Sequence, residues 1–165
     1  MEDPKLFAIL NASLRDKDRS KLTPYLKYAK LMLSATGKLL RRCDRILWRG
    51  VKADLFDMYK DKLNGKVVFW GFTSTTTDMA VIENFLPENG GTIFCIQAEF
   101  AASIQKFSAF SHESEMLLPA GTIFEVRNVN KRSGTTFIEL KSVGNMLGVK
   151  PSTASEVSVS ISDLK

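Results

Sequence analysis

Residues 107–119 read FSAFSHESEMLLP, and in this stretch a polar segment changes into an apolar run. Glu113 and Glu115 are separated by one serine and are followed directly by the apolar run MLL. In an extended segment alternate residues point to the same face, so the two carboxylates are expected on one face, about 6 to 7 Å apart along the backbone. Two like charges at this spacing repel each other, and they most often indicate a strand edge that is exposed to solvent. The apolar run predicts instead that this strand enters a core, with both acids at its start.

The composition is typical of one globular domain covering residues 1–165. Of the 165 residues, 44% are hydrophobic and 25% are charged, which is ordinary for a chain that encloses a core. No stretch approaches the roughly 18 apolar residues of a membrane span. The first ten residues, MEDPKLFAIL, carry two acids where a secretory leader carries basic residues. We therefore expect a cytoplasmic protein, or a domain of a larger protein, without a membrane span.

Charge and cysteine content restrict the ligand only weakly. The net charge of +5 favours an anionic ligand without distinguishing a nucleotide from a nucleic acid or a membrane. Cys43 and Cys95 are far apart and lack metal-ligand spacing, so we expect two free thiols and no metal, with a single disulfide between them as the alternative. The sequence does not define an oligomeric state.

Helical and strand patterns are segregated along the chain, which predicts an α+β fold. Residues 1–44 have helical spacing, residues 45–150 are rich in strand patterns, and residues 151–165 form a tail or an edge strand through the alternating VSVSI. Asp3-Pro4 and Thr23-Pro24 each predict the start of a helix.

The remaining elements follow from residue type and turn signals. Helices are expected over residues 54–63 and after a cap at Thr77 or Asp78. A hairpin connection is expected over residues 131–134. The expected strands cover residues 46–51, 66–76, 92–100, 102–108, 114–119, 122–130 and 135–143.

Arg49 is the first candidate for ligand binding, because it stands where a strand ends against Gly50. A guanidinium is always charged and presents a planar fork of donors that suits a phosphate group. A glycine beside it would let a ligand approach the backbone closely. The alternative is a solvated arginine at a strand end, which is the more common situation for this pattern alone.

The second candidate is the hydroxyl-rich stretch GFTSTTTD, residues 71–78, which follows an aromatic strand. Its hydroxyls can anchor another side chain or cap a helix. The alternative interpretation is a threonine-rich strand followed by an ordinary cap.

Several other chemistries are not supported. His112 is the only histidine, and no Ser/His/Asp arrangement accompanies it. The phosphate-binding pattern GxxxxGK[ST] does not occur. Basic residues are scattered and the aromatic residues occupy apparent core positions, so nucleic-acid binding is not expected.

Taken together and in this order, LWRGV (47–51), GFTSTT (71–76) and HESEMLLPAGTIFEV (112–126) resemble the mono-ADP-ribosyltransferases of the Arg-Ser-Glu class. The resemblance covers about the last two-thirds of the chain. It implies N-terminal helices packed on a mostly antiparallel core of two sheets that form a cleft for NAD, with no metal.

The resemblance also implies roles for individual residues. The catalytic set would be Arg49, Ser74, Glu113 and Glu115, and the first acid of Glu-x-Glu marks the arginine-specific type. Thr76 retains a hydroxyl where the Ser-Thr-Ser motif usually ends in Ser. The residues implied in NAD binding are Arg49, Gly50, Ser74, Thr75, Thr76 and Phe85, of which Phe85 would pack on nicotinamide.

The implied reaction is the transfer of ADP-ribose from NAD to an exposed arginine of an acceptor protein, with release of nicotinamide. Glu115 would stabilise the oxocarbenium-like sugar, and Ser74 would orient Glu115. Arg49 would hold the pyrophosphate or ribose, and Glu113 would bind the guanidinium of the acceptor and help to remove its proton. Two alternatives remain: an NAD glycohydrolase on the same scaffold, and a catalytically inactive binding module.

Overall fold

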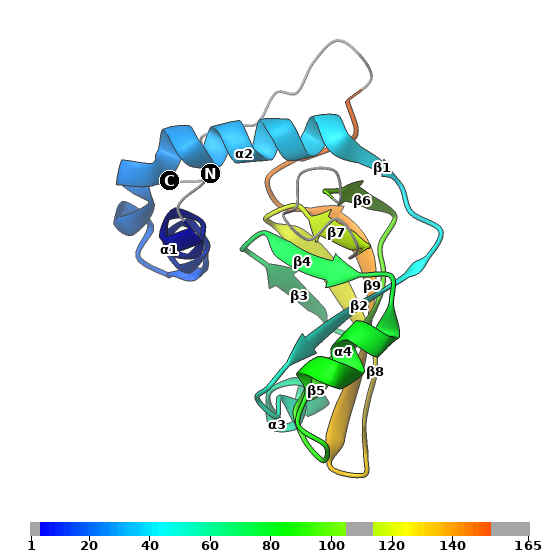
Figure 1. Ribbon diagram of the computed structural model, residues 1–165. Coiled ribbons are helices and arrows are strands. Elements are labelled where there is room, and N and C mark those ends of the chain that lie inside the picture. The colour runs from blue at the N-terminus through cyan, green and yellow to red at the C-terminus, as the bar shows by residue number, and fades with distance from the viewer. Residues whose placement is uncertain (1–3, 105–113, 153–165) are drawn as a thin grey trace.

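The computed structural model describes residues 4–104 and 114–152, in which helices and 3-10 helices flank a nine-stranded sheet (Figure 1). The helical elements are α1 (Pro4–Arg15), η1 (Arg19–Tyr25), α2 (Leu26–Leu39), α3 (Phe56–Tyr59), η2 (Lys60–Lys62) and α4 (Met79–Phe85). The strands are β1 (Leu40–Arg42), β2 (Ile46–Val51), β3 (Lys66–Phe69), β4 (Thr73–Thr76), β5 (Thr92–Gln97), β6 (Phe100–Ser103), β7 (Glu115–Leu118), β8 (Thr122–Arg132) and β9 (Thr135–Asn145).

The strand order is β1-β6-β7-β4-β2-β5-β9-β8-β3, and every neighbouring pair is antiparallel except β5 and β9. Strands β2 and β4 share only one registered pair, Trp48 with Thr76. The sheet therefore consists of a group of four strands and a group of five that separate beside this pair. The predicted α+β class and mostly antiparallel core are confirmed.

Two hydrophobic clusters stabilise the two parts of the molecule. In the first, α1, η1 and α2 pack on the smaller strand group through Leu10, Leu14, Leu22, Leu33, Leu40, Phe72 and Leu117. The second lies mainly along the larger group, through Leu47, Phe94, Ile96, Phe124, Ile138 and Leu140, and includes Leu118 of β7. Burial of such side chains contributes about 1.5–3 kcal/mol each. In Figure 1, α1 and α2 lie toward one end of the molecule and α3 and α4 toward the other.

Turn chemistry places two connections where the sequence predicts them. The β8–β9 hairpin turns at Ser133 and Gly134, whose φ angles of 48° and 82° are the positive values of a type I′ turn. Helix α4 begins after Asp78, whose carboxylate accepts a hydrogen bond from the Ala80 amide at 2.9 Å.

Other boundaries differ from the predicted ones. Pro24 lies inside the 3-10 helix η1, which Asp18 caps through the amide of Ser20, and α2 starts only at Leu26. The predicted helix over 54–63 is one α-turn followed by a 3-10 turn. The range predicted to be helical also contains strand β1. The predicted strand 66–76 is two strands, because Phe72 forms hydrogen bonds with a helix side chain rather than with a neighbouring strand. The VSVSI segment lies outside the described residues.

Candidate active site

Arg49, Ser74 and Glu115 come from three neighbouring strands, β2, β4 and β7, and are joined by hydrogen bonds. The Arg49 guanidinium donates from Nη1 to the backbone oxygen of Ser74 at 2.9 Å. The Ser74 hydroxyl donates to Oε1 of Glu115. The chain of contacts spans the point where β2 and β4 separate, so three residues far apart in sequence form one site.

Strand register explains why Ser74 and Glu115 meet. In the antiparallel pair β4–β7, Ser74 lies opposite Leu117 and Thr76 lies opposite Glu115. Paired residues project to the same face, and so do residues two apart, which puts Ser74 diagonally beside Glu115. Both side chains are half-buried. The carboxylate is therefore held in one orientation while remaining within reach of a ligand.

The two threonines after Ser74 use their hydroxyls within the protein. Thr75 donates to the backbone oxygen of Met116 at 2.7 Å, and the Thr76 hydroxyl accepts from the amide of Asp78 at 3.1 Å. Both threonines are buried. The hydroxyls of Thr75 and Thr76 thus anchor a strand and cap a helix, as this interpretation of the stretch predicts. Among the hydrogen bonds of the described residues, Ser74 is the one member of the stretch whose hydroxyl donates to an acidic side chain. An NAD contact by Thr75 or Thr76 stays a prediction.

Gly50 lies directly beneath helix α4. A Cβ added to Gly50 would come within 2.9 Å of Cγ2 of Ile82 and 3.2 Å of Cδ1 of Phe85. The absence of a side chain at this position is therefore explained by helix packing. A contact between Gly50 and the dinucleotide stays a prediction.

Phe85, the last residue of α4, lies beside Gly50. The residue is 50% exposed, and the Nζ of Lys52 lies 5.0 Å from the ring centroid. An exposed aromatic face can pack on a planar ring. A contact between Phe85 and nicotinamide stays a prediction.

A small hollow of about 300 Å³, called here the Arg49 hollow, lies beside this residue between α1 and the β3–β4 connection. Its lining includes Arg15, Arg49, Trp70, Gly71, Thr73 and Phe94. Burial lowers the pKa of Arg49 from its ordinary value, and the positive charge of Arg15 lowers this pKa further. Sequence reasoning missed Arg15, because it belongs to no motif and only the packing of α1 brings it here.

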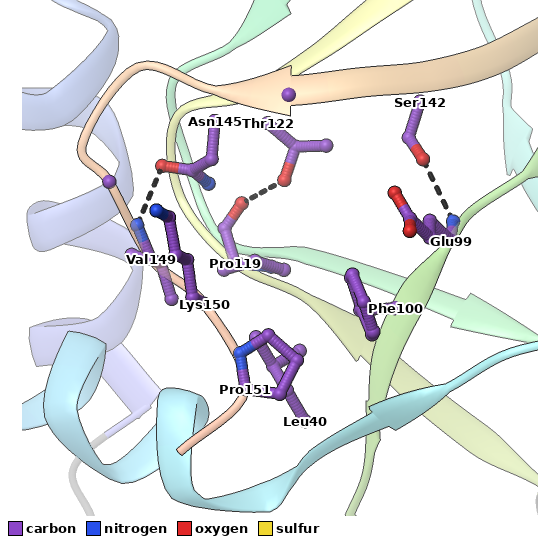
Figure 2. Close-up of a pocket in the computed structure, with 12 residues that line it drawn as sticks. Leu40, Glu99, Phe100, Pro119, Thr122, Ser142, Asn145, Val149, Lys150 and Pro151 are labelled. Atoms are coloured by element: carbon purple, nitrogen blue, oxygen red, sulfur yellow. Dashed lines mark hydrogen bonds between the residues drawn. The ribbon is translucent and has the colours of Figure 1, made fainter. Parts of the chain in front are cut away.

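A larger hollow lies elsewhere among the described residues. It has a volume of about 690 Å³ and lies between the start of β1 and the segment 148–151 (Figure 2). Its lining includes Leu40, Phe100, Pro119 and Val149, but none of Arg49, Ser74 and Glu115. The volume of a hollow therefore does not identify the candidate active site. The hydrogen bonds that join Arg49, Ser74 and Glu115 identify it better.

Glu113 and His112 lie outside the described residues, so the structure does not place the predicted acceptor-binding acid. Within the described ranges, no group of three or more His, Cys, Asp or Glu side chains is arranged to hold a metal ion. Over the same ranges, none of the helices combines the length and the apolar character that a membrane-spanning helix requires.

The fold is that of the ADP-ribosyltransferases. The structure matches the Vis enzyme in complex with agmatine with a TM-score of 0.68 at 21% identity, covering 94% of this chain and 79% of that one. Vis is a toxin from Vibrio splendidus. HopU1 of Pseudomonas syringae matches with a TM-score of 0.59 at 22% identity, covering 87% of this chain and 67% of that one.

Sequence comparison identifies the family. The model of the NAD:arginine ADP-ribosyltransferases matches residues 4–147, and the chain belongs to this family. Chicken NAD(P)(+)--arginine ADP-ribosyltransferase 1 is 33% identical over 100 residues, which are 61% of this chain and 30% of that protein. Human ecto-ADP-ribosyltransferase 5 is 30% identical over 118 residues, 72% of this chain and 39% of that protein. The chain thus spans less than half the length of these relatives.

The prediction of a cytoplasmic protein is wrong. Relatives from human, rat and mouse are named ecto-ADP-ribosyltransferases, and the prefix denotes enzymes that face the outside of the cell. The composition of a folded domain carries little information on location, because leaders and anchors are separate segments.

Proposed function

We propose that this protein transfers ADP-ribose from NAD to arginine side chains and releases nicotinamide. The observation that carries the proposal is the hydrogen-bonded trio at the separation of β2 and β4, in which Ser74 orients Glu115 and Arg49 contacts the backbone of Ser74. Membership of a family named for NAD and arginine supports the same reaction.

Glu115 would act on the sugar. Cleavage of the bond between nicotinamide and ribose passes through an oxocarbenium-like state, whose positive charge a nearby carboxylate stabilises. Ser74 engages Oε1, and within the described residues no hydrogen bond engages Oε2. Oε2 can therefore accept a hydrogen bond from a ribose hydroxyl, and this bond strengthens as the sugar becomes cationic.

Glu113 would act on the acceptor. A protonated guanidinium has a pKa above about 12 and is a poor nucleophile. A carboxylate two positions before Glu115 can bind the guanidinium and help to take its proton as the nitrogen attacks the sugar. The guanidino nitrogen would form the new C–N bond to the ribose as the bond between ribose and nicotinamide breaks. Nicotinamide would leave, and Glu113 would take the proton of the guanidinium.

The experiment is incubation with labelled NAD and agmatine, with separation of ADP-ribosylagmatine, free ADP-ribose and nicotinamide. We expect transfer by the wild type and a loss of both transfer and hydrolysis of about 100-fold or more in Glu115→Gln. Glu113→Gln should lose transfer but retain part of the NAD hydrolysis. Undiminished transfer by Glu113→Gln contradicts its assigned role.

The same assay separates the alternatives. A wild type that releases ADP-ribose at a rate independent of agmatine is a glycohydrolase. A wild type that leaves NAD intact is a binding module, and the proposal is then wrong.

A further inference from the structure

Helix α2 presents basic side chains to solvent along one side. The exposed residues on this side follow the spacing of a single helix face and are Lys27, Lys30, Leu31 and Lys38. Arg41 extends the set, because its Nη1 donates to the backbone oxygen of Lys38 at 3.0 Å. In Figure 1, α1 and the strands lie on one side of α2. We call these five exposed residues the α2 basic face.

The positive charge of the chain is concentrated around this helix. Residues 19–43 contain seven of the 23 basic residues and none of the 18 acidic ones, so the rest of the chain has 16 basic and 18 acidic residues and a net charge of −2. Two of the seven have partners within the protein: Lys21 pairs with Asp16 at 2.7 Å, and Arg19 lies over the ring of Trp70 at 4.7 Å. The surface around α2 is therefore basic while the rest of the chain is slightly acidic.

The electrostatics of an isolated helix do not explain these cations. Lys38 lies in the last turn of α2, where a cation is favourable. Lys27 lies in the first turn, where a cation is unfavourable, and this turn has no acidic residue. None of the ion pairs among the described residues includes Lys27, Lys30, Lys38 or Arg41. These charges are thus unmatched within the described structure, and an anionic partner would stabilise them.

Leu31 indicates which kind of anionic partner fits. Among the described residues it is the most exposed of the large hydrophobic side chains, at 64%, and it lies between lysines of the same face. A linear polyanion such as a nucleic acid or a sulfated glycan offers phosphate or sulfate groups, from which an exposed leucine gains nothing. At a bilayer surface, a leucine can enter the boundary between headgroups and acyl chains while lysines keep their ammonium groups at the phosphates.

The shape of the face agrees with a broad partner. The hollows of about 690, 250 and 300 Å³ are lined by none of Lys27, Lys30, Leu31 and Lys38. The face is the outer side of a helix and not a cavity for a small molecule. An extended surface can contact all of its side chains at once.

We propose that the α2 basic face binds the surface of a membrane that contains anionic phospholipids, with Leu31 at the boundary between headgroups and acyl chains. Each cation close to such a surface strengthens binding about fivefold. The other side of α2 is packed in the first hydrophobic cluster, so the helix lies on the membrane and does not enter its core. The inference is independent of the proposed transferase activity.

The test is sedimentation of the full chain with vesicles of phosphatidylcholine alone and of phosphatidylcholine with about 30% phosphatidylserine. We expect binding to the anionic vesicles only, and release in about 0.5 M salt because salt screens the attraction. The triple variant Lys27→Gln, Lys30→Gln, Lys38→Gln should bind about 100-fold more weakly. Leu31→Ser should bind about threefold more weakly, because it removes apolar contact only.

A matched control changes three exposed lysines outside the face. The variant Lys62→Gln, Lys66→Gln, Lys141→Gln alters η2, β3 and β9 and lowers the net charge by the same amount. It should bind the anionic vesicles as the wild type does. An equal loss in this control overturns the inference, since net charge and not the α2 basic face would then control binding.

Three further results overturn the inference. They are undiminished vesicle binding by the triple α2 variant, equal binding of the wild type to both kinds of vesicle, and wild-type binding to duplex DNA or heparin but not to the anionic vesicles. The last result would assign the face to a linear polyanion. Glutamine has nearly the same helix propensity as lysine, so the variants should fold normally, and melting temperatures check this.

The outcomes for the inference and for the proposed function are separable. Transfer to agmatine, a small soluble acceptor, should be unchanged in the triple α2 variant, because none of its three lysines lines the Arg49 hollow. Normal vesicle binding without any turnover of NAD refutes only the proposed transferase. Normal turnover by a wild type that does not bind anionic vesicles refutes only the membrane inference.

Discussion

Two polar networks on this sheet differ in how fully their charges are matched. At the β8–β9 hairpin, Asp54 accepts hydrogen bonds from Lys131 at 2.5 Å, from the Thr136 hydroxyl at 2.6 Å and from the Phe56 amide at 3.0 Å. At the separation of β2 and β4, Arg49 faces Arg15 across a hollow and donates only to a backbone oxygen among the described residues. In the first network, the negative charge of Asp54 is paired with the positive charge of Lys131, and these contacts stabilise a loop. In the second, neither Arg15 nor Arg49 forms an ion pair among the described residues.

The largest expected effect comes from removing the hydroxyl that orients Glu115. Ser74→Ala should lower kcat/KM for NAD about 100-fold, because a misplaced carboxylate stabilises the sugar cation poorly. The free energy of unfolding should change little, since Ser74 is only half-buried. Steady-state kinetics and denaturant unfolding of the same variant give both values. An unchanged kcat/KM would mean that Glu115 does not need Ser74.

Gly50→Ala separates a packing role from a ligand role. The added methyl group would meet Ile82 at 2.9 Å, so the variant should lose about 1–2 kcal/mol of stability through displacement of α4. Denaturant unfolding measures this loss. A variant that is as stable as the wild type but binds NAD weakly would favour the predicted ligand contact over helix packing.

Changes in the hydrogen bonds around Asp54 should alter the free energy of unfolding and leave the affinity for NAD unchanged. Thr136 is completely buried, and Thr136→Val removes one donor to Asp54. We expect a loss of about 1 kcal/mol in the free energy of unfolding, with KM for NAD unchanged. Thr135→Val on the same strand is a control, because its hydroxyl donates to a backbone oxygen of a neighbouring loop, Gly90, and not to Asp54. A change in KM for NAD in Thr136→Val would mean that the two networks are coupled.

The smallest effect is expected from pH. The Lys131 ammonium, followed by the Thr136 hydroxyl and the Phe56 amide, lowers the pKa of Asp54 below its ordinary value. A carboxylate with a lowered folded-state pKa contributes stability above its unfolded pKa of about 3.9, and the contribution is lost as the pH falls through the folded-state value. Asp54→Asn should therefore flatten the decline of stability below about pH 4. A decline identical to that of the wild type would show that other carboxylates account for it.

Local patterns predicted much of the fold and the central part of the site. The strand that contains Arg49 and the strand after Glu113 were predictable because apolar and β-branched residues favour strands. The family resemblance of three short segments identified Arg49, Ser74 and Glu115 before any of them could be placed. The break between β3 and β4 was not predictable, because it depends on the hydrogen bonds of Asn11 with Phe72, 61 residues away in sequence.

The surroundings of two residues, Gly50 and Arg15, also depend on elements that lie far away in sequence. Gly50 looked like a ligand contact, and the structure puts a helix over it. Arg15 had no local signal, and the structure puts it beside Arg49. In both cases the deciding neighbour, Ile82 for Gly50 and Gly71 for Arg15, comes from a different element.

The sequence alone determined the family, the α+β class and the residue types of the candidate site, because these depend on local periodicity and on short motifs. Only the tertiary structure decided that Ser74 orients Glu115, that Thr75 and Thr76 use their hydroxyls internally, and that α1 supplies a second arginine. The physical reason is that hydrogen bonding and charge act over a few ångströms in space. Strand register and helix packing, which set those distances, join residues that lie tens of positions apart in the chain.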